Sequence, residues 1–365
     1  MSKYYFYDLA VLILALLFNI HKLVVLQIIH PRHTILLGSL ASSHSIFSHM
    51  APLNHIKCSL LVLFLVNLTH FGLASRIRKL NEYIFPTLEN PLAYHNGEVL
   101  QGKIPVSIVW YGTFTPTQKY ILTNFIESLT HDENQQQQPC PSVSQWFDKI
   151  NQLYPSQLQK NCPTTHVHLE NKQIVDENYS KGKYLTEDQI SQLAALAERK
   201  KGEIAIVFTA EDVAVEGFCM DHCALHKSDP NTGALLIWVG NSATQCPGHC
   251  SWPFHQPVYG PMCPPLTAPN GDIGIDGMVI NLAHMIAGTI TNPFGNGFYQ
   301  GTAELPLEAS TACPGAYANG HFPGYAGNLP TDSSGASYNA NGANGQKYLL
   351  PAIFDPSTCS CTTMV

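Results

Sequence analysis

The chain has 365 residues, of which 45% are hydrophobic and 10% aromatic. This apolar content supports a packed core and excludes a wholly disordered or fibrous protein. Charged residues make up only 12%, and the formal net charge is −7. Because no basic block is available to follow a phosphate backbone, the composition argues against nucleic acid as a partner.

Residues 1–74 contain two apolar segments that are typical of membrane-directed sequence. The first covers residues 9–29, and the second has an apolar core at 58–66. After the second segment, Gly72 and Ala74 fit signal-peptidase cleavage before Ser75. The alternative is that residues 9–29 form a genuine signal anchor. We expect an upstream extension that is a gene-model artefact (1–49), a signal peptide (50–74) and one mature domain (75–365).

The first half of the mature chain predicts alternating strands and helices. A β-rich run at 104–112 predicts a buried strand, and Thr117 is expected to cap the helix that follows. A second helix is expected over 143–153. Thr186 opens a third through a capping box with Gln189, and Gly202 is expected to end it. Two further buried strands are expected at 204–209 and 235–239.

From Asn241 onward Gly, Pro, Asn and Cys become dense. Regular structure is expected only in an apolar helix over 276–290 and a terminal strand near 347–354. Strand, helix and strand with short connections predict a mixed α/β (α+β) domain. We expect a single domain in which helices flank a mixed sheet and disulfides brace a loop-rich C-terminal half.

Ten cysteines follow the signal segment, an even number that suits a disulfide framework in an oxidising compartment. Their pairing cannot be derived from the sequence. The disulfide candidates are Cys140, Cys162, Cys219, Cys223, Cys246, Cys250, Cys263, Cys313, Cys359 and Cys361. In a secreted protein, the sequon at Asn178 predicts a glycosylated surface position.

Several long segments of unusual composition resemble the EXORDIUM / phosphate-induced protein family of plants, from about Leu80 to the C-terminus. They are WYGTFTPTQKYILTNFIESL (110–129), WVGNSATQCPGHCSWPFHQPVYGP (238–261), DGMVINLAHMIAGTITNPFGNGFYQG (276–301) and YLLPAIFDPSTCSC (348–361). The resemblance implies a secreted protein of the apoplast or cell wall, associated with brassinosteroid-linked cell expansion and growth. It supplies no catalytic mechanism. We therefore predict a non-catalytic factor that binds a wall polysaccharide or a cell-surface protein, with no cofactor and no membrane span after signal cleavage.

Histidines are the candidate metal ligands, because oxidation leaves imidazoles free: His222, His226, His255 and His284. The helix around His284 resembles the zinc-binding helix of zincin metallopeptidases, which implies His284 as the first ligand. Met285 then stands where the catalytic Glu belongs, and Gly288 stands at the next ligand position. Neither residue can do that chemistry. We expect a degenerate zincin-like scaffold at most; the alternative is a metal-dependent hydrolase that binds zinc through an atypical histidine set.

Two other features allow a functional and a structural interpretation. Asp272 and Asp276 could flank a sugar as glycosidase carboxylates do, but we expect them to serve turns and helix caps. Aromatic side chains in glycine-rich loops could stack on sugars or anchor a peptide, although they could also fill a loop-rich core. These are Trp238, Trp252, Phe254, Tyr259, Phe298, Tyr299, Phe322 and Tyr325.

Overall fold

The computed structural model describes residues 92–130, 138–158, 163–261, 263–303 and 305–365. The chain divides into two units, 1–85 and 86–365, and the description below concerns the second. The predicted extension, signal peptide and cleavage site lie outside the described residues, as does Cys162.

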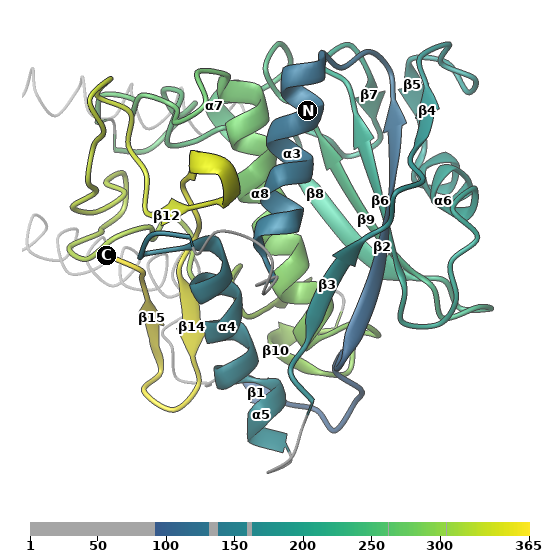
Figure 1. The fold of residues 1–365 in the computed structure, drawn as a ribbon, viewed down its shortest axis with the longest axis horizontal. Coiled ribbons are helices and arrows are strands. Elements are labelled where there is room, and N and C mark those ends of the chain that lie inside the picture. The colour runs from purple at the N-terminus through teal and green to yellow at the C-terminus, as the bar shows by residue number, and fades with distance from the viewer. Residues whose placement is uncertain (1–91, 131–137, 159–162, 262, 304) are drawn as a thin grey trace, which may run out of the picture. The chain divides into compact units, whose positions relative to one another are not determined.

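A six-stranded mixed sheet forms the centre of the described fold (Figure 1). Its strands are β2 (Lys103–Tyr111), β3 (His166–Leu169), β4 (Ile174–Asp176), β6 (Ile204–Thr209), β8 (Ala224–Ser228) and β9 (Leu235–Gly240). The order is β3-β2-β6-β9-β8, and β4 also pairs with β2. All pairs are parallel except that of β8, which runs antiparallel to β9 at the edge. Strands β6 and β9 are buried throughout, as expected for a sheet covered on both faces.

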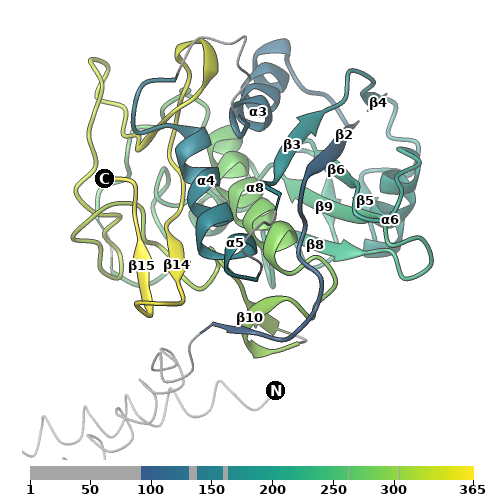
Figure 2. The same ribbon diagram turned by 60° about the horizontal axis from the view of Figure 1, so that its bottom comes forward.

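Helices cover both faces of this sheet (Figures 1 and 2). The helices are α3 (Pro116–Ser128), α4 (Val143–Leu153), α5 (Pro155–Leu158), α6 (Glu187–Ala195), α7 (Pro247–Cys250) and α8 (Ile273–Thr291). On one face α8 packs on β8 and β9, and α3 packs on β3 and α8. On the other face α6 packs on β6 and β9. The expected class, a mixed α/β domain with flanking helices and a disulfide-braced C-terminal half, is confirmed.

The remaining strands are short and pair outside the main sheet. The pairs are β1 (Ala93–Tyr94) with β10 (Phe298–Thr302) and β10 with β11 (Leu305–Leu307), β5 (Tyr184–Leu185) with β7 (Ala214–Val215), β12 (Ala340–Asn341) with β13 (Lys347–Tyr348), and β14 (Ile353–Asp355) with β15 (Ser360–Thr362). A 3₁₀ turn covers Ala343–Gly345. The expected continuous terminal strand over 347–354 was wrong, because β13 and β14 are separate strands with Pro351 between them.

The capping predictions are confirmed in part. Thr186 caps α6 and forms the expected capping box with Gln189. Helix α3 begins two residues earlier than expected, because Thr115 rather than Thr117 accepts from the backbone N–H of Gln118. Helix α6 also ends before Gly202. Beyond its last residue the backbone N–H groups of residues 196–198 bond to carbonyls three residues earlier, as in a 3₁₀ turn, and Glu198 then adopts a φ of +53°.

Helix α8 is longer than expected and is capped by Asp272, whose carboxylate accepts from the N–H groups of Gly274 and Ile275. Among the described residues it alone is long and apolar enough to cross a bilayer. However, 78% of its most apolar window is buried inside the protein. We therefore interpret α8 as the core helix of the domain.

Candidate functional site

One face of α8 carries His284 and Gly288, and Asn292 caps its C-terminal end. The four-residue spacing places these positions above one another along the helix. This face meets β8 and the turn at 308–311, which supply the polar groups described below. It is also the face to which the zincin resemblance assigns the metal ligands.

A buried, hydrogen-bonded pair of side chains fills the space beside Gly288. His226 Nε2 on β8 lies 2.7 Å from Glu308 Oε2, and the two side chains are only 11% and 4% exposed. The other carboxylate oxygen of Glu308 accepts from Asn292 Nδ2 at 2.8 Å. A Cβ at Gly288 would lie 2.2 Å from Glu308 Oε2 and 2.9 Å from His226 Nε2. The second zincin ligand position therefore has no room for a side chain.

His284 is held one turn earlier on the same face. Its Nδ1 lies 2.9 Å from Ser310 Oγ, and the Ser310 hydroxyl donates to the carbonyl of Ala352. The ring keeps some contact with solvent, but the surrounding protein lowers the pKa of His284 to about 4. The imidazole is thus neutral at physiological pH and is oriented by a hydroxyl rather than by a carboxylate.

The four candidate histidines do not form one site. His226 pairs with Glu308, while His255 Nδ1 lies 3.0 Å from the carbonyl of Gln256. His222 lies before β8 with its ring edge-on to Trp238. In the described part of the chain, no three of these four bring their nitrogens within 4.8 Å of one another.

Two adjacent disulfides join the loop before β8 to α7. Cys219 bonds to Cys246 and Cys223 bonds to Cys250, each across 27 residues, and the sulfurs of Cys246 and Cys250 lie 3.6 Å apart. His249 lies close to the Cys223–Cys250 bridge, and this trio forms the one compact group of potential metal ligands in the described residues. Because both sulfurs belong to a disulfide, the trio offers no thiolate to a metal.

A third disulfide, Cys313–Cys361, joins the turn after Glu308 to β15. Cys140, Cys263 and Cys359 form no bridge within the described residues, so for them the expectation of a complete framework stays a prediction. Cys140 and Cys359 are exposed, and Cys263 is partly buried.

The two carboxylates at the start of α8 are structural, as expected. Asp272 is the helix cap and also accepts from Gln118 Nε2 on α3 at 2.9 Å. Asp276 is 2% exposed and accepts two hydrogen bonds from Asn270. Burial raises the pKa of Asp276 to about 7; the Asn270 hydrogen bonds oppose the rise, and the Asp272 charge adds to it. A carboxylate this enclosed cannot reach a sugar.

These pKa shifts predict opposing effects of pH on stability. The pKa of Asp276 is raised by folding, so its contribution is full below about pH 4 and is lost as pH rises through about 7. The pKa of His284 is lowered by folding, so its contribution is full above about pH 6.5 and is lost as pH falls towards 4. We expect Asp276→Asn to abolish the loss of stability that the Asp276 carboxyl causes as pH rises. The free energy of unfolding of this variant should then increase between about pH 4 and 6.5 and stay level to pH 8.

Urea unfolding from pH 4 to pH 8 measures this change, with each group contributing at most about 1.4 kcal/mol per pH unit. His284→Gln is the matched variant. It should abolish the gain in stability that His284 causes as pH rises from about 4 to 6.5. An Asp276→Asn profile parallel to that of the unaltered chain would contradict the assignment.

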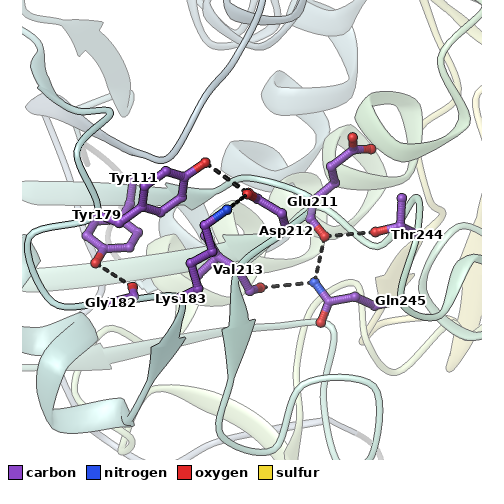
Figure 3. A network of polar contacts seen from close by, with 9 residues as sticks. All are labelled: Tyr111, Tyr179, Gly182, Lys183, Glu211, Asp212, Val213, Thr244 and Gln245. Atoms are coloured by element: carbon purple, nitrogen blue, oxygen red, sulfur yellow. Dashed lines mark hydrogen bonds and ion pairs between the residues drawn. The ribbon is translucent and has the colours of Figure 1, made fainter.

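A polar network lies where the parallel strands β2 and β6 end (Figure 3). Asp212 accepts from Tyr179 Oη at 2.9 Å and from Lys183 Nζ. Partial burial opposes ionisation, but these two hydrogen bonds outweigh it and hold the pKa of Asp212 below its usual value. Thr244 and Gln245 donate to the carbonyl of Glu211 at 2.8 and 3.0 Å. The network thus joins the loops after β4, β6 and β9 and supports the edge at which α/β sheets often bind ligands.

The aromatic candidates divide between core and surface. Trp238, Phe254 and Phe298 are buried, which confirms the structural interpretation for them. Tyr259 and Phe322 are 73% and 57% exposed. Trp252, Tyr299 and Tyr325 lie between these extremes. Asn178 is exposed in the turn after β4, so the sequon is accessible, although its glycosylation stays a prediction.

The chain was compared with known protein families, curated proteins and solved structures. Residues 92–364 match the family model described as the phosphate-induced protein 1 conserved region. The chain belongs to the EXORDIUM / phosphate-induced protein family. Protein PHOSPHATE-INDUCED 1 of Nicotiana tabacum is 50% identical over 316 residues, covering 84% of this chain and 98% of that protein. Protein EXORDIUM of Arabidopsis thaliana is 50% identical over 282 residues, or 75% of this chain and 89% of its own length.

A third family member, protein EXORDIUM-like 1 of Arabidopsis thaliana, is 48% identical over 278 residues, covering 74% of this chain and 89% of that protein. No solved structure matches the chain. The degenerate zincin-like scaffold therefore stays a prediction for this chain.

Proposed function

We propose that this member of the EXORDIUM / phosphate-induced family is a secreted, non-catalytic factor of the apoplast or cell wall. It acts in brassinosteroid-linked cell expansion by binding a wall polysaccharide or a cell-surface protein. Family membership and three disulfides, which are typical of oxidising compartments, support the extracellular placement. The signal-peptide pattern ending at Ala74 supports it independently.

The observation that carries the non-catalytic assignment is the closed face of α8. A catalytic zinc site needs three protein ligands and an open position for water. Here Met285 replaces the general base, and Glu308 with His226 occupies the space beside Gly288. The Glu308 carboxylate is committed to His226 and Asn292, so it is not free to act on a substrate.

The proposal predicts that His284→Gln leaves growth activity unchanged. Both forms would be expressed from Met50 in plant cells, recovered from extracellular fluid with an N-terminus near Ser75, and compared by leaf-cell area. A Gln side chain can still hydrogen-bond to Ser310 Oγ, so we expect normal secretion. The matched control is His166→Gln, at an exposed position on β3.

Loss of growth activity in a His284→Gln protein that is secreted at normal levels and melts at the normal temperature would overturn the non-catalytic assignment. Retention of the active protein inside the cell would overturn the extracellular one.

A further inference from the structure

Two glycine-rich loops with exposed aromatic side chains contact each other in the C-terminal half. The first contains Val258 and Tyr259, which are 67% and 73% exposed. The second contains Phe322 and Tyr325, whose rings stack at 4.9 Å between centroids and 29° between planes. A Cβ at Gly324 would lie 2.7 Å from both the Cβ and the carbonyl oxygen of Pro261, so these loops touch. We call residues 258, 259, 261, 322 and 325 the aromatic rim.

The second loop holds its rings on a rigid turn. Phe322 and Tyr325 exchange backbone hydrogen bonds of 3.1 and 2.8 Å. Pro323 and Gly324 lie between them, and the Gly324 φ of +87° suits the third position of a type II turn. Pro323 has a fixed φ that suits the second position of this turn, and Gly324 adopts its positive φ without strain. Little conformational entropy is left to lose when a ligand covers the rings.

Both loops are anchored in the same small apolar cluster, separate from the main core. Phe254 from the first loop packs there with Tyr317 and Ala326 from the second. Tyr317 and Ala318 also donate backbone hydrogen bonds to the carbonyl of Ala326. The bases of the loops are therefore fixed, while Tyr259 and Phe322 remain exposed at the surface. Exposed rings on a fixed support are typical of a binding surface.

The rim has no charge, although the chain as a whole is acidic. Residues 230–271 contain no Asp, Glu, Lys or Arg, and neither do residues 309–331. Beside the rings lie the imidazole of His249, 6.4 Å from the Tyr259 ring, and the neutral amide of Asn328, whose Oδ1 accepts from Tyr325 Oη at 2.9 Å. The Asn328 amide nitrogen has no hydrogen-bond partner among the described residues. An uncharged aromatic surface with an amide donor complements a neutral ligand that presents flat apolar faces and hydroxyls.

We propose that the aromatic rim binds a neutral β-1,4-linked glucan, with pyranose faces stacked on Phe322 and Tyr259. In such a glucan the ring hydroxyls are equatorial, so each sugar face presents C–H groups to an aromatic ring. This inference rests on the proposed binding role and names the partner class for it. Acidic glycans such as polygalacturonate should bind less well, because the rim lacks a cation to pair with their carboxylates.

The test measures binding of the full secreted protein to microcrystalline cellulose by depletion and to soluble xyloglucan by calorimetry. We expect Phe322→Ala to weaken both about tenfold, as removal of an exposed aromatic anchor does. Phe322→Tyr should bind normally. Tyr184→Ala is the matched control, because Tyr184 is 62% exposed on β5, on the side opposite the C-terminal loops in both views (Figures 1 and 2).

The inference fails if the unaltered protein binds neither glucan, if it prefers polygalacturonate, or if Phe322→Ala binds as tightly as Tyr184→Ala. Growth activity separates this failure from that of the proposed function. A protein that promotes growth without binding glucan overturns only the glucan assignment. A His284→Gln protein that binds glucan but no longer promotes growth overturns only the non-catalytic one.

Discussion

Removing both bridges that join the loop before β8 to α7 should destabilise the protein by about 6 kcal/mol, enough to unfold an ordinary domain. The first bridge to form closes a loop of 27 residues, and this contributes about 3.5 kcal/mol in the chain-entropy model. The second closes only the short ring made by residues 219–223 and 246–250, and it contributes about 2.7 kcal/mol. Either bridge alone should therefore keep the domain folded.

The variants are Cys219→Ser with Cys246→Ser, Cys223→Ser with Cys250→Ser, and all four together, each measured by guanidinium unfolding. Cys140→Ser and Cys359→Ser are the matched controls, because both cysteines are exposed and form no bridge within the part of the chain that the structure describes. They should change the free energy of unfolding by less than about 0.5 kcal/mol. A fourfold variant as stable as these controls would show that the four cysteines form no stabilising bridges, and a double variant as unstable as the fourfold one would show that their pairing is wrong.

Gly288→Ala should lower the free energy of unfolding by about 2–3 kcal/mol, against the usual preference of helices for alanine. The new methyl group would meet Glu308 Oε2 at 2.2 Å, closer than real contacts allow. Glu308 cannot withdraw without losing its hydrogen bonds to His226 and Asn292, and each buried polar group left unpaired costs about 1–3 kcal/mol. An open ligand position would give the opposite sign, because Gly→Ala in an unobstructed helix stabilises by about 1 kcal/mol.

Much of the sheet and its helices could be predicted from local sequence. The capping box at Thr186 and the apolar run of β6 are decided by neighbours in the chain, and both were predicted. The antiparallel edge strand β8 was missed, because its sequence ALHKS is short and only half apolar. The end of α6 was misplaced because Glu198, a non-glycine residue, adopts the positive φ that was expected only at Gly202.

The candidate site was less accessible to sequence reasoning. The sequence alone predicts the loss of peptidase chemistry at Met285 and Gly288, because neither side chain can act as a general base or bind a metal. The groups that fill the space could not be predicted, since Glu308 lies 82 residues from His226. One available signal was missed: Glu308 is a carboxylate directly before an uncharged stretch, where a buried and paired acid is plausible. The disulfide pairing was equally undetermined, because the two paired-cysteine motifs allow a crossed arrangement with similar spacing.

The central claim is that Glu308 closes the α8 face at Gly288, and a double-mutant cycle in urea tests it most directly. The cycle compares Gly288→Ala in the unaltered chain with Gly288→Ala in a Glu308→Ala background. We predict a loss of about 2–3 kcal/mol in the first and of at most about 1 kcal/mol in the second, because the obstructing carboxylate is gone and only His226 Nε2, at 2.9 Å, still lies close to the new methyl group. Equal effects in both backgrounds, within about 0.5 kcal/mol, would show that Gly288 does not pack on Glu308 and would contradict the closed site.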